Sequence, residues 1–288
     1  MVKIFTTKNS KITWIEEPNY GTLPPAGQSP SQRVFTYPGW VRSIDLPFVN
    51  AIEGIEDIED PDKLFAAWYQ SQVDIEGEME LNMTGVTTLS YALKPWSNTS
   101  KSRAVEIVHV PSDTVFAIYG FVPSGLSLEV EEGELVRLTI PFIAQRLAKE
   151  DAAIAEEYGT RPEPSSVLKF SDVSLYKDGV QLTDWISFSL DVSYDVMRLR
   201  DANERYPHDV EFQRNLQIEG SITMPIDTEL LNELVNSTTF TLELRGLPGN
   251  KKLTLEDCVW TEIPAKADVG DLEAYIDYSF RALNASVV

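Results

Sequence analysis

One short pattern occurs twice in this chain, and it limits the fold more than any other feature. Val73–Met79 reads VDIEGEM, and Leu216–Ile222 reads LQIEGSI. In both segments apolar and polar residues alternate around a glycine, which is the pattern of a β-strand with one buried face and one polar face. A chain that carries the same strand in each half is expected to build the same β-rich unit twice.

Two further pairs of segments match in the same order. Trp40–Leu46 parallels Trp185–Leu190 when a small gap is allowed, and Gly133–Val136 parallels Gly270–Glu273 ahead of a final strand in each half. Any two β-rich stretches can align by chance, but three matches in one order favour duplication. Two copies of a sheet unit can lie edge to edge, and a closed ring of such units leaves no strand edge exposed.

The remaining pattern is mainly β, with two segments that we expect to be helical. Asp227–Val235 reads as a short helix with Asp227 as its N-cap. In Leu147–Ser166, apolar residues such as Ile154 and Tyr158 share one helical face, so we expect a helical connector that ends in an extended linker. Residues 1–30 are rich in proline and glycine and are expected to be loop-rich.

Charge and composition exclude several classes of function. The chain has 45 acidic and 24 basic residues and a formal net charge of -21, which is the opposite of what a nucleic-acid-binding surface or an anionic membrane requires. The chain has only one cysteine and two histidines. A zinc site built on Cys and His, or a catalytic centre that needs a histidine, is therefore not expected. The hydrophobic fraction of 43% is enough for a real core.

Four segments, in this order and spacing, resemble one known family. They are Glu16–Pro24 (EEPNYGTLP), Tyr119–Leu135 (YGF, then LSL, a glycine and a strand), Asp178–Leu190 (DGV, then ISFSL) and Arg205–Phe240 (RYP, then IEGSI, a helix and TF). Together they span most of the chain and resemble the tail tube proteins of long-tailed viruses of bacteria and archaea. The acid-rich excursion Glu53–Asp62 and the long connector depart from the pattern of that family.

The resemblance implies a mainly β fold with two tandem β-sandwich or half-barrel domains of the tail-tube type, each with a short helix, joined by a helical linker. We place a loop-rich arm at 1–30, tube domain 1 at 31–146, the linker at 147–168 and tube domain 2 at 169–288. No catalytic residue, cofactor, metal or membrane insertion is expected.

The resemblance also implies an assembly. Three chains would close a pseudo-sixfold ring, and rings would stack into a tube around a tape-measure protein, together with the tail-terminator and tail-tip proteins of the same virion. The tube would belong to the virion tail, be assembled in the host cytoplasm, and pass double-stranded DNA without binding it specifically.

Strand alternation selects the side chains that would line such a tube. The polar rows of three strands supply the predicted lumen residues, which are Asp74, Glu76, Glu78, Glu80, Gln217, Glu219, Ser221, Thr223, Asp271, Glu273 and Asp277. An acidic wall would repel DNA over a range of about 8–10 Å at ordinary salt. The alternative is the ordinary solvated face of an antiparallel sheet.

Two excursions of opposite charge are the predicted arms for contacts between subunits or rings. The acidic arm contains Glu53, Glu56, Asp57, Glu59, Asp60 and Asp62, and the basic arm contains Arg198, Arg200, Arg205 and Arg214. The simpler interpretation of each is a solvated loop.

Two other functions remain open from the sequence. Glu76 and Glu78 lie about as far apart as the two carboxylates of a glycoside hydrolase on a β-sandwich, although Ser221 replaces the second acid in the repeat. A non-catalytic carbohydrate-binding or virion-decoration module is the third candidate, with tryptophans as the sugar platform.

Overall fold

The computed structural model describes residues 3–6, 10–26, 33–46, 48–49, 52–55, 67–70, 74–97, 101–110, 114–201, 206–225, 228–262 and 275–288. The first half contains β1 (Lys3–Thr6), β2 (Ser10–Glu16), β3 (Val34–Phe35), β4 (Trp40–Leu46), β5 (Phe48–Val49), β6 (Ile52–Ile55), β7 (Ala67–Gln70), β8 (Asp74–Asn82), α1 (Thr87–Leu93), β9 (Arg103–His109), β10 (Thr114–Pro123), β11 (Gly125–Glu131), β12 (Arg137–Ala144) and β13 (Arg146–Glu150). After β14 (Glu157–Tyr158), the second half contains β15 (Ser174–Lys177), β16 (Val180–Gln181), β17 (Ser187–Leu199), β18 (Asp209–Pro225), α2 (Thr228–Asn236), β19 (Phe240–Leu247), β20 (Lys251–Glu262), β21 (Tyr275–Ala282) and β22 (Asn284–Val287).

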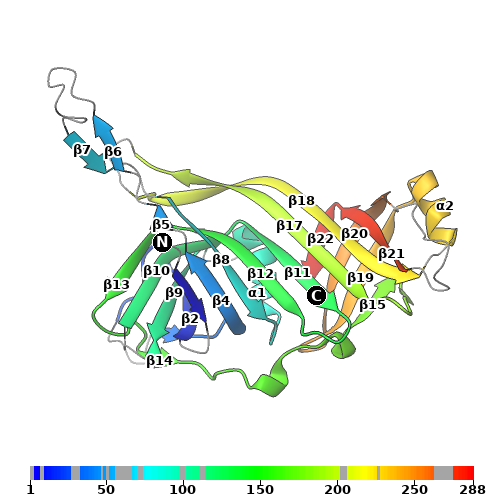
Figure 1. The fold of residues 1–288 in the computed structure, drawn as a ribbon, viewed down its shortest axis with the longest axis horizontal. Coiled ribbons are helices and arrows are strands. Elements are labelled where there is room, and N and C mark those ends of the chain that lie inside the picture. The colour runs from blue at the N-terminus through cyan, green and yellow to red at the C-terminus, as the bar shows by residue number, and fades with distance from the viewer. Residues whose placement is uncertain are drawn as a thin grey trace.

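The strands form two layers that run through both halves (Figure 1). The front layer is antiparallel and follows the order β1, β4, β8, β12, β11, β17, β18, β21 and the end of β20. The back layer consists of β2, β9, β10 and β13 in the first half and of β15, β16, β19, β20 and β22 in the second. A mainly β fold with a short helix in each half is therefore confirmed.

The main strand pairings of the two halves correspond, although β11 with β12 and β15 with β16 have no counterpart among the described strands. β4, β8 and β12 are paired in the same order as β17, β18 and β21, and β10 and β20 each bend from the back layer into the front layer. The bends coincide with residues of positive φ, Gly120 (φ 66°) and Asp257 (φ 53°). The gap in the repeat falls at Arg42, where the register of β4 on β8 shifts by one residue. This correspondence is consistent with a duplicated unit.

The repeated glycine has the same structural cause in both halves. A Cβ on Gly77 would lie 2.7 Å from the ring of Phe142 and against the carbonyl oxygen of Asp45. A Cβ on Gly220 would lie 2.5 Å from the ring of Phe280 and against the carbonyl oxygen of Ser189. A phenylalanine from the neighbouring strand covers each glycine, an arrangement that stabilises glycine within a sheet.

The segment after β12 differs from the prediction. Leu147–Ser166, expected to be a helical connector, contains no α-helix: β13 pairs with β10, β14 pairs in parallel with β3, and Pro164–Ser166 is a single 3₁₀ turn. The fully buried Glu106 causes this, because its carboxylate accepts hydrogen bonds from the backbone nitrogens of Ile154 (2.6 Å) and Ala155 (3.2 Å). Those N–H groups are held by a side chain of the sheet, so the linker is extended.

Two other expectations concern the ends of elements. Residues 1–30, expected to be a loop-rich arm, also supply β1 and β2, and Trp14 of β2 is buried in the core. The helix predicted at Asp227–Val235 is α2, although Asp227 itself lies outside the described residues. In the part of the chain that the structure describes, no helix has the length and apolar character that crossing a membrane requires.

The two glycines yield a first prediction. Gly77→Ala and Gly220→Ala should each lower the free energy of unfolding by about 1–3 kcal/mol, because the added methyl group overpacks the contact with the phenylalanine ring. Gly85→Ala is the matched control, since no atom lies within 4 Å of a Cβ at that position. Urea denaturation measures all three, and equal stability of the three variants would contradict this account of the repeat.

Candidate functional site

The pairing of β11 with β17 joins the two halves into one surface. It runs over seven residue pairs, from Gly125 opposite Ser193 to Glu131 opposite Ser187. Leu128 and Leu190 meet on its buried side, and both are 0% exposed. The other side carries only polar residues of the two strands, so a single polar face continues from the first half into the second.

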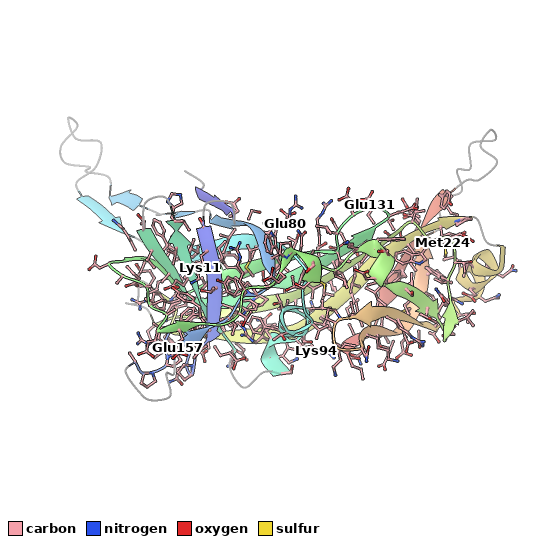
Figure 2. All side chains as sticks on the ribbon, turned by 90° about the horizontal axis from the view of Figure 1, so that it is seen from below. Lys11, Glu80, Lys94, Glu131, Glu157 and Met224 are labelled. Carbon is pink, nitrogen blue, oxygen red and sulfur yellow. The ribbon has the colours of Figure 1, made fainter. Side chains whose placement is uncertain are left out.

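The predicted lumen residues that the structure describes lie on this polar face. Along β8, Asp74, Glu76 and Glu78 are exposed and Glu80 is half-buried, while Ile75 and Met79 between them are buried. Along β18 and β21, the predicted residues Gln217, Glu219, Ser221, Thr223 and Asp277 are exposed or half-buried on the same face. Figure 2 shows Glu80 and Glu131 on this broad face and Lys94 on the opposite side. Asp271 and Glu273 lie outside the described residues.

Arginines on neighbouring strands pair with part of the acidic row. Arg42 pairs with Glu80, Arg137 with Glu129 at 3.5 Å, and Arg281 with Glu219 at 2.8 Å. Sequence reasoning missed these pairs because each depends on the register of two neighbouring strands, even for Arg137 and Glu129, which lie on the β11–β12 hairpin. Acidic side chains still outnumber basic ones among the described residues of the face. Besides the acids in these three pairs, the face carries Asp45, Glu78, Glu131, Asp191 and Asp277. The pairs are exposed, and such pairs stabilise little.

The outer part of the β17–β18 hairpin, residues 194–200 and 206–213, lies over the first half. Figure 1 shows it extending beyond the end of β11 across the top of β12 and β8. Val196 and Phe212 pack against Val122 and Ile143 of the first half, together with Val210. We call this set of contacts the clasp.

Aromatic rings and hydrogen bonds complete the clasp. Trp96, just after α1, contacts Tyr194 (ring centroids 5.1 Å apart) and Phe212 (5.7 Å). The Tyr194 hydroxyl donates to the carbonyl oxygen of Ala92 at 2.8 Å, and the Gln145 amide donates to that of Pro207 at 2.9 Å. The clasp therefore combines apolar burial with directional bonds.

Two of the predicted arm arginines are part of the clasp. Arg198 pairs with Glu76 at 2.8 Å and with Asp74 at 3.6 Å, and Arg200 also pairs with Asp74. The side chains of both arginines are largely buried (18% and 10% exposed), whereas the two acids are about half exposed or more. Within one chain, these arginines thus meet the acidic row of β8.

The other arm residues cannot be placed by the structure. The side chain of Arg214 in β18 and that of Glu53 in β6 lie outside its description, as does Arg205. The same holds for the remaining residues of the acidic arm, which are Glu56, Asp57, Glu59, Asp60 and Asp62. Their contacts stay a prediction.

The four segments that carry the family resemblance meet in two places. The first is the β11–β17 pairing, in which the LSL segment at Leu126–Leu128 lies opposite Leu190–Val192. The second lies beside the clasp, where the EEPNYGTLP loop meets Gly120. The buried carboxylate of Glu17 accepts hydrogen bonds from the backbone nitrogens of Gly21 (2.9 Å) and Gly120 (3.1 Å).

The environment of Glu17 indicates a structural role. Burial raises the pKa of its carboxyl group, and the hydrogen bonds from Ser102, Gly120 and Gly21 oppose this rise. The Ser102 hydroxyl donates at 2.6 Å. Because the carboxylate binds both Gly21 of its own loop and Gly120 of β10, Glu17 fixes the loop to β10.

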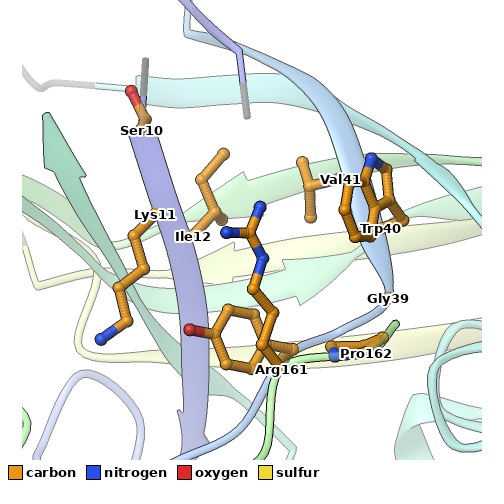
Figure 3. A pocket seen from close by; sticks show the side chains of 9 residues that line it. Ser10, Lys11, Ile12, Gly39, Trp40, Val41, Arg161 and Pro162 are labelled. Carbon is orange, nitrogen blue, oxygen red and sulfur yellow. The ribbon is translucent and has the colours of Figure 1, made fainter. Parts of the chain in front are cut away.

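The groups that the alternative functions would use lie as follows in the described part of the chain. No cluster of three or more His, Cys, Asp or Glu among them could hold a metal ion. Glu76 and Glu78, the candidate glycosidase pair, are both exposed, and Glu76 is paired with Arg198. A shallow pocket between β2 and β4 contains Lys11 and Arg161, and there the Arg161 guanidinium covers the Trp40 ring at 5.0 Å (Figure 3).

Three of the tryptophans whose side chains the structure describes are buried in the fold. Trp14 and Trp260 are buried and Trp185 is 8% exposed. Trp14 contacts Tyr91 and Phe121, and Trp260 stacks on Phe240 at 4.4 Å. These rings serve the core, so they do not form a platform for a sugar.

The ion pairs of the clasp yield a second prediction. The double variant Arg198→Glu, Arg200→Glu places four carboxylates together, so the outer hairpin should detach from β8. Amide hydrogens of residues 194–199 should then exchange faster, and the free energy of unfolding should fall by about 1–2 kcal/mol. Adding Asp74→Arg and Glu76→Arg should restore slow exchange. Arg281→Glu, at an exposed pair, is the control. Unchanged exchange in the double variant would show that the pairs do not hold the clasp.

The comparison with known proteins agrees with this geometry. A family model described as "phage tail tube protein" matches residues 7–282, which is nearly the whole chain. No curated protein matches the sequence. Except for β1 and β22, the match includes both layers, and it includes the β11–β17 pairing and the clasp. It implies a structural protein of the virion tail that assembles with itself and with other tail proteins. The chain belongs to the phage tail tube protein family.

Proposed function

We propose that three copies of this chain close a pseudo-sixfold ring and that rings stack into the tail tube. The observation that carries the proposal is the continuous front layer, in which two equivalently paired halves are joined through β11 and β17. If the halves are duplicated domains, at 31–146 and 169–288, each domain in the ring has a neighbouring domain of the same fold on either side. The same kind of edge pairing can then be repeated between copies until the ring closes.

The polar face of the front layer forms the lumen wall in this proposal. Its support is the alternation of exposed acids with buried apolar residues on β8, β18 and β21. The cross-strand arginines reduce the negative charge without reversing it. A wall of net negative charge repels the phosphates of double-stranded DNA and leaves the genome unbound during passage.

The remaining assignments follow from the same role. The tube would form around a tape-measure protein and meet tail-terminator and tail-tip proteins at its ends, with assembly in the host cytoplasm. The chain would act as a structural conduit and not as an enzyme. The exposed positions of Glu76 and Glu78 support this, because a glycosidase acid needs an environment that sets it apart from its partner.

Electron microscopy with site-specific labelling tests the proposal. Glu78→Cys and Val180→Cys place a thiol on the polar face and on an exposed strand of the back layer, and the native Cys258 is buried. The purified variants are assembled, with tape-measure and tail-tip proteins where these are needed as a nucleus, and then treated with biotin-maleimide and streptavidin–gold.

We expect hollow rings or tubes with three copies per ring by native mass spectrometry. Gold should decorate tubes of Val180→Cys along their outer surface and leave tubes of Glu78→Cys bare, because streptavidin–gold is too bulky to enter the lumen. Compact monomers under every condition would refute the ring. Gold along the outside of Glu78→Cys tubes would refute the acidic lumen.

A further inference from the structure

A short strand from the N-terminus occupies one edge of the front layer. β1 pairs with β4 in the antiparallel direction, from Lys3 opposite Leu46 to Thr6 opposite Ser43. On its other side, β4 pairs with β8. Among the described residues, β1 makes its strand pairing with β4 alone, so β1 is the last strand of the layer.

The place of β1 on β4 corresponds to the place of β11 on β17. The repeated glycines set the equivalence: Glu78 follows Gly77 and lies opposite Asp45 of β4, while Ser221 follows Gly220 and lies opposite Ser189 of β17. Asp45 and Ser189 are therefore equivalent positions. On their free sides, Asp45 lies opposite Ile4 of β1 and Ser189 lies opposite Glu129 of β11, in the same antiparallel direction.

The two edges differ in how firmly they are covered. β11 makes seven residue pairs with β17, continues as a hairpin into β12 and contacts α1. β1 makes four residue pairs with β4 and has no strand on its outer side in the described part of the chain. The β17 edge and the β4 edge are thus equivalent positions in the two halves. The β17 edge is covered by β11 of the other half, whereas the β4 edge is covered only by the short strand β1.

We propose that the β4 edge is the surface to which a strand from the second half of another copy adds, and that β1 covers this edge until then. The proposal rests on the ring described above. The partner must be a second half, because the strand beside β17 comes from the opposite half of the molecule. β1 has a protective role, since an uncovered edge strand is a template for uncontrolled pairing with other chains.

The covering strand also sets a concentration threshold. β1 is tethered to its own chain, and a tethered strand competes at an effective concentration that reaches millimolar values for short flexible tethers. A strand from another copy must displace β1 from β4. It can do so if it pairs with β4 over more residues than the four that β1 uses. Rings therefore form only when the concentration of subunits, or a nucleus of tail proteins, favours the exchange.

A disulfide lock tests the proposal. Thr6→Cys with Ser43→Cys places two thiols on directly opposite residues of β1 and β4. The matched control is Ser127→Cys with Asp191→Cys, which are opposite residues of the β11–β17 pairing. Each variant is oxidised, checked by thiol titration and mass spectrometry, and assembled beside its reduced form, with electron microscopy and light scattering as readouts.

The oxidised β1–β4 variant should remain monomeric, and reduction should restore rings to the level of the wild type. The oxidised control should assemble normally, because its lock lies inside one chain at a pairing that the ring keeps. If the oxidised β1–β4 variant forms rings as readily as its reduced form, the inference fails while the ring proposal stands. If no reduced or wild-type sample assembles, the ring proposal itself fails.

A truncation gives an independent readout. A chain without residues 1–6 should assemble at a concentration lower by about tenfold or more, because the tethered competitor is gone. An unchanged threshold would show that β1 does not guard the edge. Loss of assembly by a folded truncated chain would show that β1 is itself the bridge between copies, which also overturns the proposal.

Discussion

The backbone pairing of β11 with β17 is the interaction on which the rest of the structure depends. It joins the strands of the two halves into one front layer with one polar face and one buried face. The clasp depends on this pairing, because the outer hairpin is the continuation of β17 and β18 beyond it. The pairing therefore places the hairpin over the first half. An arrangement that joins two halves edge to edge can be repeated between chains, which is the physical basis of the proposed tube.

The clasp shows how charge is used at this junction. The arginines of the second half lie largely buried against the acids at the start of β8, and apolar packing around Phe212 places them there. The two largely buried arginines thus lie at one end of the acidic face, while Arg42, Arg137 and Arg281 form more exposed pairs elsewhere on it. Local ion pairing and a net negative face are compatible because the acids of the face outnumber the arginines that pair with them.

Much of the fold could be predicted from alternation alone. The period of two along β8, β17 and β18 predicted their buried faces correctly, since Met79, Leu190 and Ile222 are buried and the residues beside them are exposed or half-buried. The connector was wrong because its apolar spacing fits a helix, while the decisive interaction, Glu106 with the backbone at Ile154, comes from a strand far away in sequence. The partners of Arg198 and Glu17 escaped prediction for the same reason. Such contacts exist only once the sheet order is known.

A reconstruction of the assembled tube at a resolution that traces strands tests the central claim most directly. The account predicts one continuous inner barrel in which each β4 edge adjoins the second half of another copy. Glu78 and Glu219 would face the channel, and the clasp would stay within each chain. A tube whose copies meet through their back layers, with the β8 acids on the outer surface, would contradict it.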